Sequence, residues 1–535
     1  MTGRRARSTA LPVLGLGLGA TLLFSGCVRE PERPNVLLIT IDTLRQDRVS
    51  CYGVRTGTTP QLDRLAEESL VFTHCQSPRA KTTPAIASLM SGLYPHEHGV
   101  RDLTMPLAPD VPVLAEAFHD AGYRTGAIVG NYVLKDELSG LAQGFDMWGE
   151  DMPDTQGVPP DDVPQRTARS LTSGALVALG LAAANGDQAA GPARPFVRDA
   201  RPWFLWLHYM DPHGQYAPPP EHDLFESPEE RVFVDANGNV VHDGPKNTLS
   251  RPWLAAYNVP AAAREADGTI AVSAVRDLYD GEVHYVDAEL GRLLDALRTA
   301  ALLETTVIVV TADHGESLGE HEYWFEHGRY AYEVTCRVPL LVRLPGDLKG
   351  RPSPRRETAD VSLVDLGPTL LELAGLRELP VYRRPDGTPA QLGPTSRGRS
   401  RAELLWTGEG GARAVFSEKV ERSEKAGAVQ TKAVRIGDWK FIRRYTFRPL
   451  ADSEERELVV LSEELYDLVQ DPYESVNRIA EPPPGAPLDR LRAELFDYSR
   501  ADVRFEDLAR LLQEKREELE RTDRETLRIL EALGY

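Results

Sequence analysis

Five continuous apolar runs constrain the fold of this chain more than any other feature. They are NVLLITID, RTGAIVGN, PWFLWLHYMD, TTVIVVTADHG and RVPLLVRLP. Runs of this kind, without alternating polar residues, are typical of strands buried on both faces of a sheet. Segments whose apolar residues recur with helical spacing lie between them, among them TPQLDRLAEESLVF, DVPVLAEAFHDAG and EVHYVDAELGRLLDALRTAALL. This alternation predicts an α/β fold with a large, mostly parallel sheet flanked by helices.

The length and charge of the chain narrow the classes of function. Its 535 residues are enough for a large α/β domain and a smaller one. A hydrophobic fraction of 41% and a charged fraction of 27% are typical of a globular protein. The net charge of −20 disfavours binding to nucleic-acid phosphates, so we expect no nucleic-acid partner. An anionic substrate would need a local positive site, such as a metal ion.

The composition after the apolar runs predicts further parts. A segment rich in Pro, Gly and Arg, 377–400, is predicted to be a linker. Beyond it, KAVRIGDWKFIRRY and EELYDLVQDPYES predict strands joined by turns. We therefore expect an α/β domain over 35–377, a small C-terminal α+β subdomain over 401–482 and a charged, helical tail over 488–535.

The N-terminus has the features of an export signal. Three arginines at positions 4, 5 and 7 precede the apolar run LPVLGLGLGATLLF, and SGC with Cys27 follows it. This pattern predicts a lipoprotein signal peptide over 1–27, because the run is short and glycine-rich for a membrane span of about 20 residues. Its end resembles a bacterial lipobox, with Phe24 where Leu is usual. We expect lipidation of Cys27 to anchor the exported chain in the bacterial cell envelope, in the periplasm or at the outer membrane. The alternatives are cleavage elsewhere and a retained anchor.

The other cysteines do not predict a catalytic or metal site. Cys51, Cys75 and Cys336 are scattered without the spacing of metal ligands. One disulfide among them is compatible with an exported chain, and the sequence does not choose the pair.

Polar side chains follow three of the predicted strands. They are Asp42, Asp211 and the pair Asp313 and His314. In open α/β sheets ligands bind outside the carboxyl ends of the strands, so these residues could converge. Two carboxylates and an imidazole would hold a divalent metal ion, for which zinc or manganese is better suited than calcium. The alternative is that each Asp is a helix cap or turn former.

The stretch KTTPAIASLMSGLYPHEHGV combines a predicted helix start with hydroxyl side chains. Pro84 is favoured in the first turn of a helix, which Thr82 or Thr83 would then cap. A helix N-terminus receives a tetrahedral anion well, and a metal-bound threonine hydroxyl there could attack it. By spacing alone, the same residues also fit an ordinary structural cap.

Several ordered motifs resemble the sulfatase family of the alkaline phosphatase superfamily. NVLLITIDTLRQDRVSCYG resembles the family's opening strand with its first metal ligand, which would be Asp42. TTPAIASLMSGLYPHEHGV resembles the family signature, and HYMDPHGQY the segment whose histidine contacts substrate, here His213. VVTADHGESLGEH, followed by FEHG, resembles the second metal segment with Asp313 and His314. WKFIRRY and ELYDLVQDPYESVN resemble the C-terminal subdomain. The resemblance implies an alkaline-phosphatase-like fold and an ester hydrolase.

Three positions depart from the sulfatase pattern. Thr82 aligns with the Cys or Ser that becomes formylglycine, and threonine cannot yield that aldehyde. Ile86 and Asn131 stand where an Arg and a Lys are usual. Threonine at this position resembles superfamily phosphodiesterases and phosphotransferases, in which a metal-bound Thr takes up the phosphoryl group.

The resemblance implies a concrete site. Its metal ligands would be Asp42, Thr82, Asp313 and His314, around a divalent ion (Zn, Mn or Ca). Thr82 would be the nucleophile, and His213 or His327 would contact the substrate or its leaving group. His96 and His98 are weaker candidates for the site, and Asp211 with His327 could complete a second metal site.

We therefore expect a hydrolase of sulfate, phosphate or phosphonate esters that uses Thr82 without formylglycine. The substrate would be a small molecule or a glycan ester. One alternative is a phosphotransferase that moves a head group onto an envelope glycan or lipid. Another is a metal-binding pseudoenzyme. The sequence does not predict the oligomeric state.

Overall fold

The computed structural model describes residues 33–103, 105–152, 166–182, 195–234, 240–241, 253–255, 258–264, 269–376, 379, 398–408, 410–423, 427–449, 456–500 and 521. The predicted signal peptide with Cys27, most of the predicted linker and the tail beyond 500 except Arg521 lie outside these residues. They stay predictions. Within the described ranges, no helix has both the length and the hydropathy that a membrane span requires.

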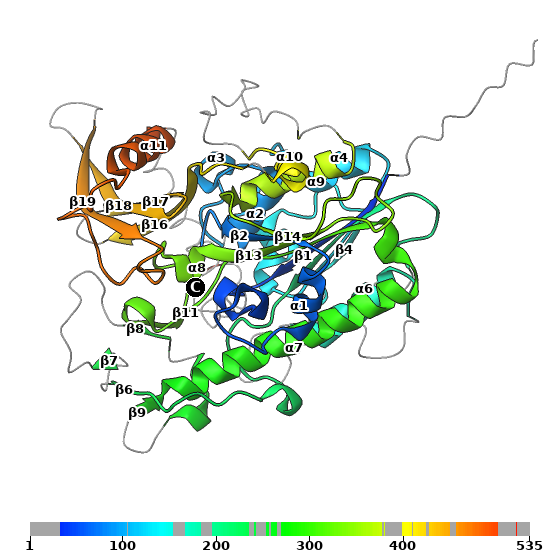
Figure 1. The fold of residues 1–535 in the computed structure, drawn as a ribbon, viewed down its shortest axis with the longest axis horizontal. Helices are drawn as coiled ribbons and strands as arrows, with labels where there is room; N and C mark the ends of the chain where they lie inside the picture. The colour runs from blue at the N-terminus through cyan, green and yellow to red at the C-terminus, as the bar shows by residue number, and fades with distance from the viewer. Residues whose placement is uncertain are drawn as a thin grey trace, which may run out of the picture. The chain divides into compact units, whose positions relative to one another are not determined.

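A large mixed sheet forms the centre of the α/β domain, which confirms the predicted fold class (Figure 1). The five predicted strands are all present, and the strands at the sheet centre, β10–β1–β5–β3, are parallel. In the described part of the chain the sheet has nine strands. Eight of them follow the order β14 (Arg355–Glu357), β2 (Leu70–Gln76), β13 (Arg337–Arg343), β10 (Thr306–Ala312), β1 (Asn35–Ile41), β5 (Trp203–Tyr209), β3 (Arg124–Val129) and β4 (Met147–Gly149). The ninth strand, β15 (Val361–Ser362), pairs with β2.

Strand β13 is the exception to the parallel arrangement. It runs antiparallel to both of its neighbours, β10 and β2. Its apolar run, like those of β1 and β10, is buried along nearly its whole length. An apolar run of this kind does not indicate its direction, so the sequence could not predict this reversal.

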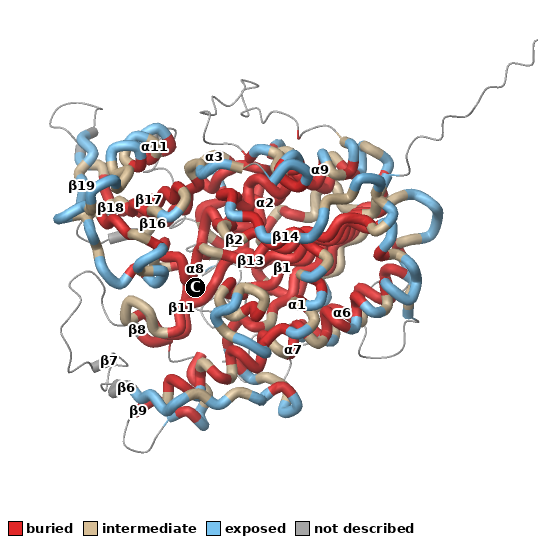
Figure 2. The backbone as a smooth tube through the Cα atoms, in the orientation of Figure 1, coloured by how far each residue is buried: buried red, intermediate tan, exposed pale blue. Residues whose placement is uncertain are grey.

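Helices cover both faces of the sheet (Figure 1). On one face lie α1 (Pro60–Ala66), α6 (Ala168–Ala178) and the long α7 (Val272–Thr299). On the other lie α2 (Thr82–Ser91), α4 (Leu114–Asp120) and α9 (Leu366–Leu373). Figure 2 shows the sheet and α2 as the most continuously buried part, with exposed residues on the outer faces of the helices. Two-sided burial explains why these strands are almost wholly apolar.

The segment TPQLDRLAEESLVF is not one helix, as its period suggested. Helix α1 ends at Ala66, and strand β2 begins at Leu70. A carboxylate from α7 fixes the start of α1, because Asp287 accepts hydrogen bonds from the backbone N–H groups of Gln61 and Leu62, both at 2.8 Å. The β2 residues then pair with β13, and this pairing outweighs the local helical spacing.

The C-terminal subdomain is an antiparallel meander with one helix. Strands β16 (Val415–Ser423), β17 (Gly427–Ile436), β18 (Trp439–Pro449) and β19 (Arg456–Asp467) pair in chain order. Helix α11 (Leu488–Arg500) packs on β17 and β18, and the ring of its Tyr498 stacks on Phe416 with centroids 4.2 Å apart.

Several short elements complete the described structure. The short helices are α3 (Pro95–His98), α5 (Asp136–Ser139), α8 (Glu333–Cys336) and α10 (Ala402–Thr407). One small sheet has the strand order β11 (Ser317–Leu318), β12 (Tyr323–Glu326), β8 (Trp253–Leu254), and another has the order β7 (Val240–Val241), β6 (Arg231–Val234), β9 (Thr269–Ala271). The 3-10 turns are η1 (Gln46–Arg48), η2 (Ser50–Tyr52), η3 (Tyr132–Leu134), η5 (Pro220–His222), η7 (Ala261–Ala263), η8 (Leu302–Thr305), η9 (Glu320–Glu322) and η10 (Leu363–Asp365).

Candidate functional site

Two carboxylates meet where neighbouring parallel strands end. Asp42 follows β1 directly, and Asp313 follows β10. The register pairs Ile41 with Ala312, the last residues of the two strands, so the two aspartates emerge side by side. Both are fully buried. The structure therefore brings together the two carboxylates that the strand ends predicted.

These carboxylates form a candidate metal site together with His208. One potential ligand atom from each of Asp42, His208 and Asp313 lies within 4.8 Å of the others. Asp42 Oδ1 and Asp313 Oδ2 are buried and have no hydrogen-bond partner among the described residues. Buried carboxylate oxygens without partners are unfavourable unless a cation neutralises them, so the residues fit a divalent metal ion.

The electrostatics of the pair support this interpretation. Burial and the neighbouring Asp42 charge raise the pKa of Asp313 well above its usual value. Burial also opposes ionisation of Asp42, but a hydrogen bond from His208 and the nearby histidines outweigh it and hold the pKa of Asp42 below its usual value. Two carboxyl groups in contact repel each other when both are charged, and a bound cation removes this repulsion.

His314 adds a neutral imidazole to the same cluster. Its Nε2 lies 3.4 Å from Asp313 Oδ2 and 3.8 Å from Asp42 Oδ1. Burial and the neighbouring His327 keep the pKa of His314 well below its usual value. Its Nδ1 faces the carbonyl oxygen of Gly315 at 3.1 Å, which favours a proton on Nδ1 and leaves the Nε2 lone pair directed at the aspartates.

The hydroxyl of Thr82 faces this cluster from the start of helix α2. Thr82 Oγ1 lies 3.4 Å from Asp42 Oδ2 and 3.4 Å from His314 Nε2, and the residue is fully buried. The prediction that Thr82 or Thr83 caps α2 is wrong. The N-cap residue is Lys81, whose side chain makes no capping hydrogen bond, and Thr83 Oγ1 donates to the carbonyl of Val133.

Two further histidines lie beside His314. The ring centroids of His314 and His327 are 4.5 Å apart, and those of His327 and His213 are 5.2 Å apart. His327 Nδ1 faces Glu316 Oε1 at 3.2 Å, and His213 Nδ1 faces the Gly214 carbonyl at 2.9 Å. All of the residues that the resemblance implied for catalysis and metal binding thus lie in one buried cluster.

Other predicted candidates lie elsewhere. Asp211 accepts a hydrogen bond from the N–H of Ala168 at the start of α6 and lies beside Glu282, so it does not join His327 in a second metal site. His98 contacts Ser88 Oγ, and His96 pairs with Glu418 of the C-terminal sheet. These three residues stabilise helix ends and interfaces.

The sequence did not identify His208 and Asn131 as members of the site. His208 lies inside strand β5, paired in register with Thr40, and its Nε2 is 3.2 Å from Asp42 Oδ2. Asn131 Nδ2 donates to Asp42 Oδ2 at 2.6 Å. A polar residue within an otherwise apolar buried strand was the available signal for His208.

The cations expected in sulfatases are absent from their usual positions, and others lie nearby. Ile86 is fully buried within α2. Arg79 and Lys81 instead precede the helix, and both contribute to a lowered pKa of His327, after burial and His213. Arg79 NH1 donates to the carbonyl of Gly328, the residue after His327.

The cysteines play no part in this cluster. Cys51, Cys75 and Cys336 are free thiols. No disulfide therefore joins the three cysteines in the described part of the chain.

Comparisons with known proteins show which proteins this chain resembles. A sequence model of the family described as Sulfatase matches residues 34–376. The N-acetylglucosamine-6-O-sulfatase of Bacteroides thetaiotaomicron is 25% identical over 521 residues, which cover 86% of this chain and 85% of that protein. The choline-sulfatase of Rhizobium meliloti is 26% identical over 491 residues, covering 88% and 86% of the two chains.

Solved structures share the fold. The phosphonate monoester hydrolase of Agrobacterium radiobacter superposes with a TM-score of 0.59 at 22% identity, covering 88% of this chain and 96% of that chain. At this level of identity the likeness concerns the fold alone.

Proposed function

Because this chain belongs to the sulfatase family, we propose that it hydrolyses sulfate, phosphate or phosphonate esters with Thr82 as the nucleophile and without formylglycine. The observation that carries the proposal is the position of Thr82 Oγ1, 3.4 Å from both Asp42 Oδ2 and His314 Nε2 in a buried cluster. A hydroxyl between a carboxylate and a neutral imidazole can lose its proton as it attacks an ester.

The same cluster would hold a divalent metal ion. Asp42, Asp313 and His314 are its proposed ligands together with Thr82, and His208 is a further candidate. A metal ion bound there would act as a Lewis acid and lower the pKa of a coordinated hydroxyl. Asn131 supports this site by its hydrogen bond to Asp42, which orients the carboxylate.

The proposed reaction has two displacement steps. Thr82 Oγ1 attacks the sulfur or phosphorus atom, the bond to the leaving-group oxygen breaks, and Asp42 Oδ2 or His314 Nε2, each 3.4 Å away, takes the Thr82 proton. His213 or His327 would contact the departing oxygen, which takes up this proton as it leaves. Water then attacks the sulfo- or phospho-threonine, which releases sulfate or phosphate (or phosphonate) and restores the Thr82 hydroxyl.

The relatives and the local charges suggest the class of substrate. The names of two relatives specify N-acetylglucosamine-6-O-sulfate and choline sulfate as sulfated substrates. We propose a small-molecule or glycan ester here as well. In place of the missing family cations at Ile86 and Asn131, Lys81 and Arg79 would supply positive charge beside His327. The predicted lipid anchor at Cys27 would hold this enzyme at the bacterial cell envelope.

Mass spectrometry of the peptide that contains Thr82 tests the nucleophile directly. The metal-loaded protein is incubated with an aryl sulfate, a phosphate monoester, a phosphodiester and a phosphonate ester, and acid-quenched. We expect a mass increase of one sulfo or phospho group on Thr82 with at least one of them. The ester that produces this modification identifies the class of substrate.

Two variants separate chemistry from folding. Thr82→Val keeps the shape of the buried side chain and removes the hydroxyl, so it is expected to lose at least about 1000-fold in turnover, as when a nucleophile is removed. Thr82→Ser keeps the hydroxyl and is expected to retain measurable activity. Turnover by Thr82→Val equal to that of the unchanged protein would refute the assignment, as would an unmodified Thr82 during turnover.

A further inference from the structure

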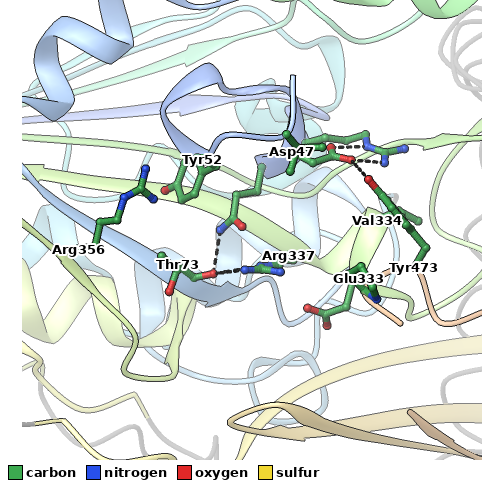
Figure 3. A pocket seen from close by; sticks show the side chains of 12 residues that line it. Asp47, Tyr52, Thr73, Glu333, Val334, Arg337, Arg356 and Tyr473 are labelled. Atoms are coloured by element: carbon green, nitrogen blue, oxygen red, sulfur yellow. Dashed lines mark hydrogen bonds and ion pairs between the residues drawn. The ribbon is translucent and has the colours of Figure 1, made fainter. Parts of the chain in front are cut away.

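A pocket distinct from the Thr82 cluster lies beside the turns that follow β1. It has a volume of about 170 Å³, and its charged lining consists of Arg45, Asp47, Glu333, Arg337 and Arg356 (Figure 3). We call it the arginine pocket. This volume is several times the roughly 30 Å³ that one water occupies in the liquid and below that of a typical drug-sized site. It suits a small ion or one end of a larger molecule.

Two of the arginines in this pocket, Arg337 and Arg356, form no ion pair within 4.0 Å of a carboxylate among the described residues. Arg337 is the first residue of β13, and both its Nε and NH2 groups donate to the carbonyl of Thr73, at 3.0 and 2.7 Å. Within the described residues, these two bonds are the hydrogen bonds of the Arg337 guanidinium. Arg356 of β14 is exposed and donates from NH2 to the carbonyl of Cys51. Figure 3 shows the two guanidinium groups on either side of Thr73.

The acidic residues of the pocket are already neutralised by other cations. Asp47 forms a two-fold ion pair with Arg45, with contacts of 2.8 Å to Nε and 2.7 Å to NH2. Glu333 contacts Arg435 at 2.5 Å and Lys440 at 3.0 Å, outside the pocket. The net charge of the pocket is therefore positive and comes from Arg337 and Arg356.

The environment of Arg337 is unfavourable for a cation without a counter-ion. Burial and the neighbouring Arg435 lower the pKa of Arg337, and Glu333 opposes them only in part. In a chain with a net charge of −20, a pair of incompletely neutralised guanidinium groups in one pocket is a local exception. Guanidinium groups bind oxyanions through parallel N–H···O bonds, and more strongly than neutral donors.

We propose that the arginine pocket binds a small oxyanion, a phosphate or sulfate group, between Arg337 and Arg356. Thr73 holds Arg337 in place through its carbonyl oxygen, so part of the guanidinium is oriented before the anion arrives. The hydroxyl of Tyr473 donates to Asp47 Oδ2 at 3.4 Å, so this tyrosine also lies at the pocket. The anion is either a free ion or the charged group of a larger ester.

Titration calorimetry on the full chain tests this proposal. The background variant is Thr82→Val, treated with EDTA, so that neither turnover nor a metal ion at the Thr82 cluster contributes. The probes are inorganic phosphate, inorganic sulfate and glucose 6-phosphate. If inorganic phosphate or sulfate binds more tightly than glucose 6-phosphate, the pocket binds a free anion. If glucose 6-phosphate binds more tightly than the inorganic ions, the pocket binds an anionic group carried by a larger molecule. Both results support the site.

Three variants locate the binding. Replacing both arginines, Arg337→Gln with Arg356→Gln, is expected to weaken binding at least about tenfold, because two charge-assisted contacts are lost. Arg64→Gln, a change at an exposed arginine of α1, is expected to leave it unchanged. Arg356→Gln alone tests the exposed half should the double variant fail to fold, and is expected to weaken binding severalfold.

The proposal is overturned if none of the probes binds up to 10 mM, a limit of about 3 kcal/mol of binding free energy. It is also overturned if the double variant binds as tightly as Arg64→Gln, or, where only the single variant folds, if Arg356→Gln does. Binding is measured without catalysis, so neither result bears on the role of Thr82.

Discussion

Glu333 is expected to be a principal contact between the α/β domain and the C-terminal sheet. It lies in α8, and its carboxylate contacts Arg435 at 2.5 Å and Lys440 at 3.0 Å, both from the C-terminal sheet. Gln76 of β2 donates to both carboxylate oxygens at 3.0 Å. All of these side chains are buried. The variant Glu333→Gln keeps the size of the side chain and removes its charge.

The expected loss in the free energy of unfolding of Glu333→Gln follows from the pKa of the Glu333 carboxyl. Burial alone would raise the pKa of Glu333, but Lys440, Arg435 and Arg337 outweigh it and lower the value from 4.5 to about 2. This difference corresponds to a contribution of about 3 kcal/mol to the free energy of unfolding at neutral pH. Breaking a buried ion pair from one side costs a similar amount, about 3 to 5 kcal/mol. We expect a loss of about 3 kcal/mol, because Lys440 keeps Glu474 at 3.0 Å as a partner.

The stability difference between the unchanged protein and Glu333→Gln should also depend on pH in a direction that can be measured. A carboxyl whose pKa is lowered in the folded state stabilises it above the unfolded value, and this contribution fades as the pH falls from about 4.5 towards 2. The difference between the unchanged protein and Glu333→Gln should therefore be full at pH 7 and smaller at pH 3.5. It is measured by urea denaturation followed by tryptophan fluorescence, with Trp439 adjacent to Lys440 in the sequence.

Glu463→Gln is the matched control in the same sheet. Glu463 pairs with Arg443 at 2.7 Å and Arg492 at 2.5 Å, but its side chain is partly exposed, and such pairs contribute about 1 kcal/mol or less. Limited proteolysis at pH 7 reports whether the C-terminal sheet opens by itself. The reasoning is refuted if Glu333→Gln destabilises no more than Glu463→Gln, or if its effect is the same at pH 7 and pH 3.5.

Two other variants test the proposed metal site and the buried carboxyl pair of Glu282 and Asp211. Asn131→Ala removes the 2.6 Å hydrogen bond to Asp42 and is expected to weaken metal binding about 10- to 100-fold in competition with a chelator, and unchanged affinity would contradict a supporting role for Asn131. Glu282→Gln is expected to raise the melting temperature at pH 8 and to lose this advantage towards pH 4. Burial and Asp211 raise the pKa of Glu282 well above 4.5, so this carboxyl destabilises the folded state increasingly as the pH rises above 4.5. If Glu282→Gln instead lowers the melting temperature at pH 8, the prediction is wrong.

The sequence predicted the fold where local pattern and topology rules agree. Apolar runs that alternate with helical segments led to the parallel strands β1, β5 and β10. Because such strands end at one edge, Asp42 and Asp313 could be expected to meet, and they do. The direction of β13 and the position of β2 depend on pairing between distant strands, which apolar content does not encode.

The place of His208, one of the two site residues that were missed, depends on strand register. Whether His208 faces Asp42 is decided by the pairing of Thr40 with His208, and a shift of one residue would turn it to the other face. Asp211 has the same local signature as Asp42, a carboxylate after a buried strand. The role of Asp211 differs because α6 begins beside it. The backbone N–H of Ala168 donates a hydrogen bond to the Asp211 carboxylate at 2.7 Å.

The role of Thr82 could not be predicted from helix-capping preferences, because the structure reverses them. A threonine at the N-cap would direct its side-chain oxygen at the helix N–H groups and accept a hydrogen bond from them. Here Lys81 occupies the N-cap position directly before Thr82, and its side chain makes no capping hydrogen bond. The Thr82 hydroxyl therefore faces Asp42 and His314, and neither threonine side chain caps the first N–H groups of α2. Uncapped N–H groups carry partial positive charge, so the helix start that leaves Thr82 Oγ1 available is also suited to receive the anion it would attack.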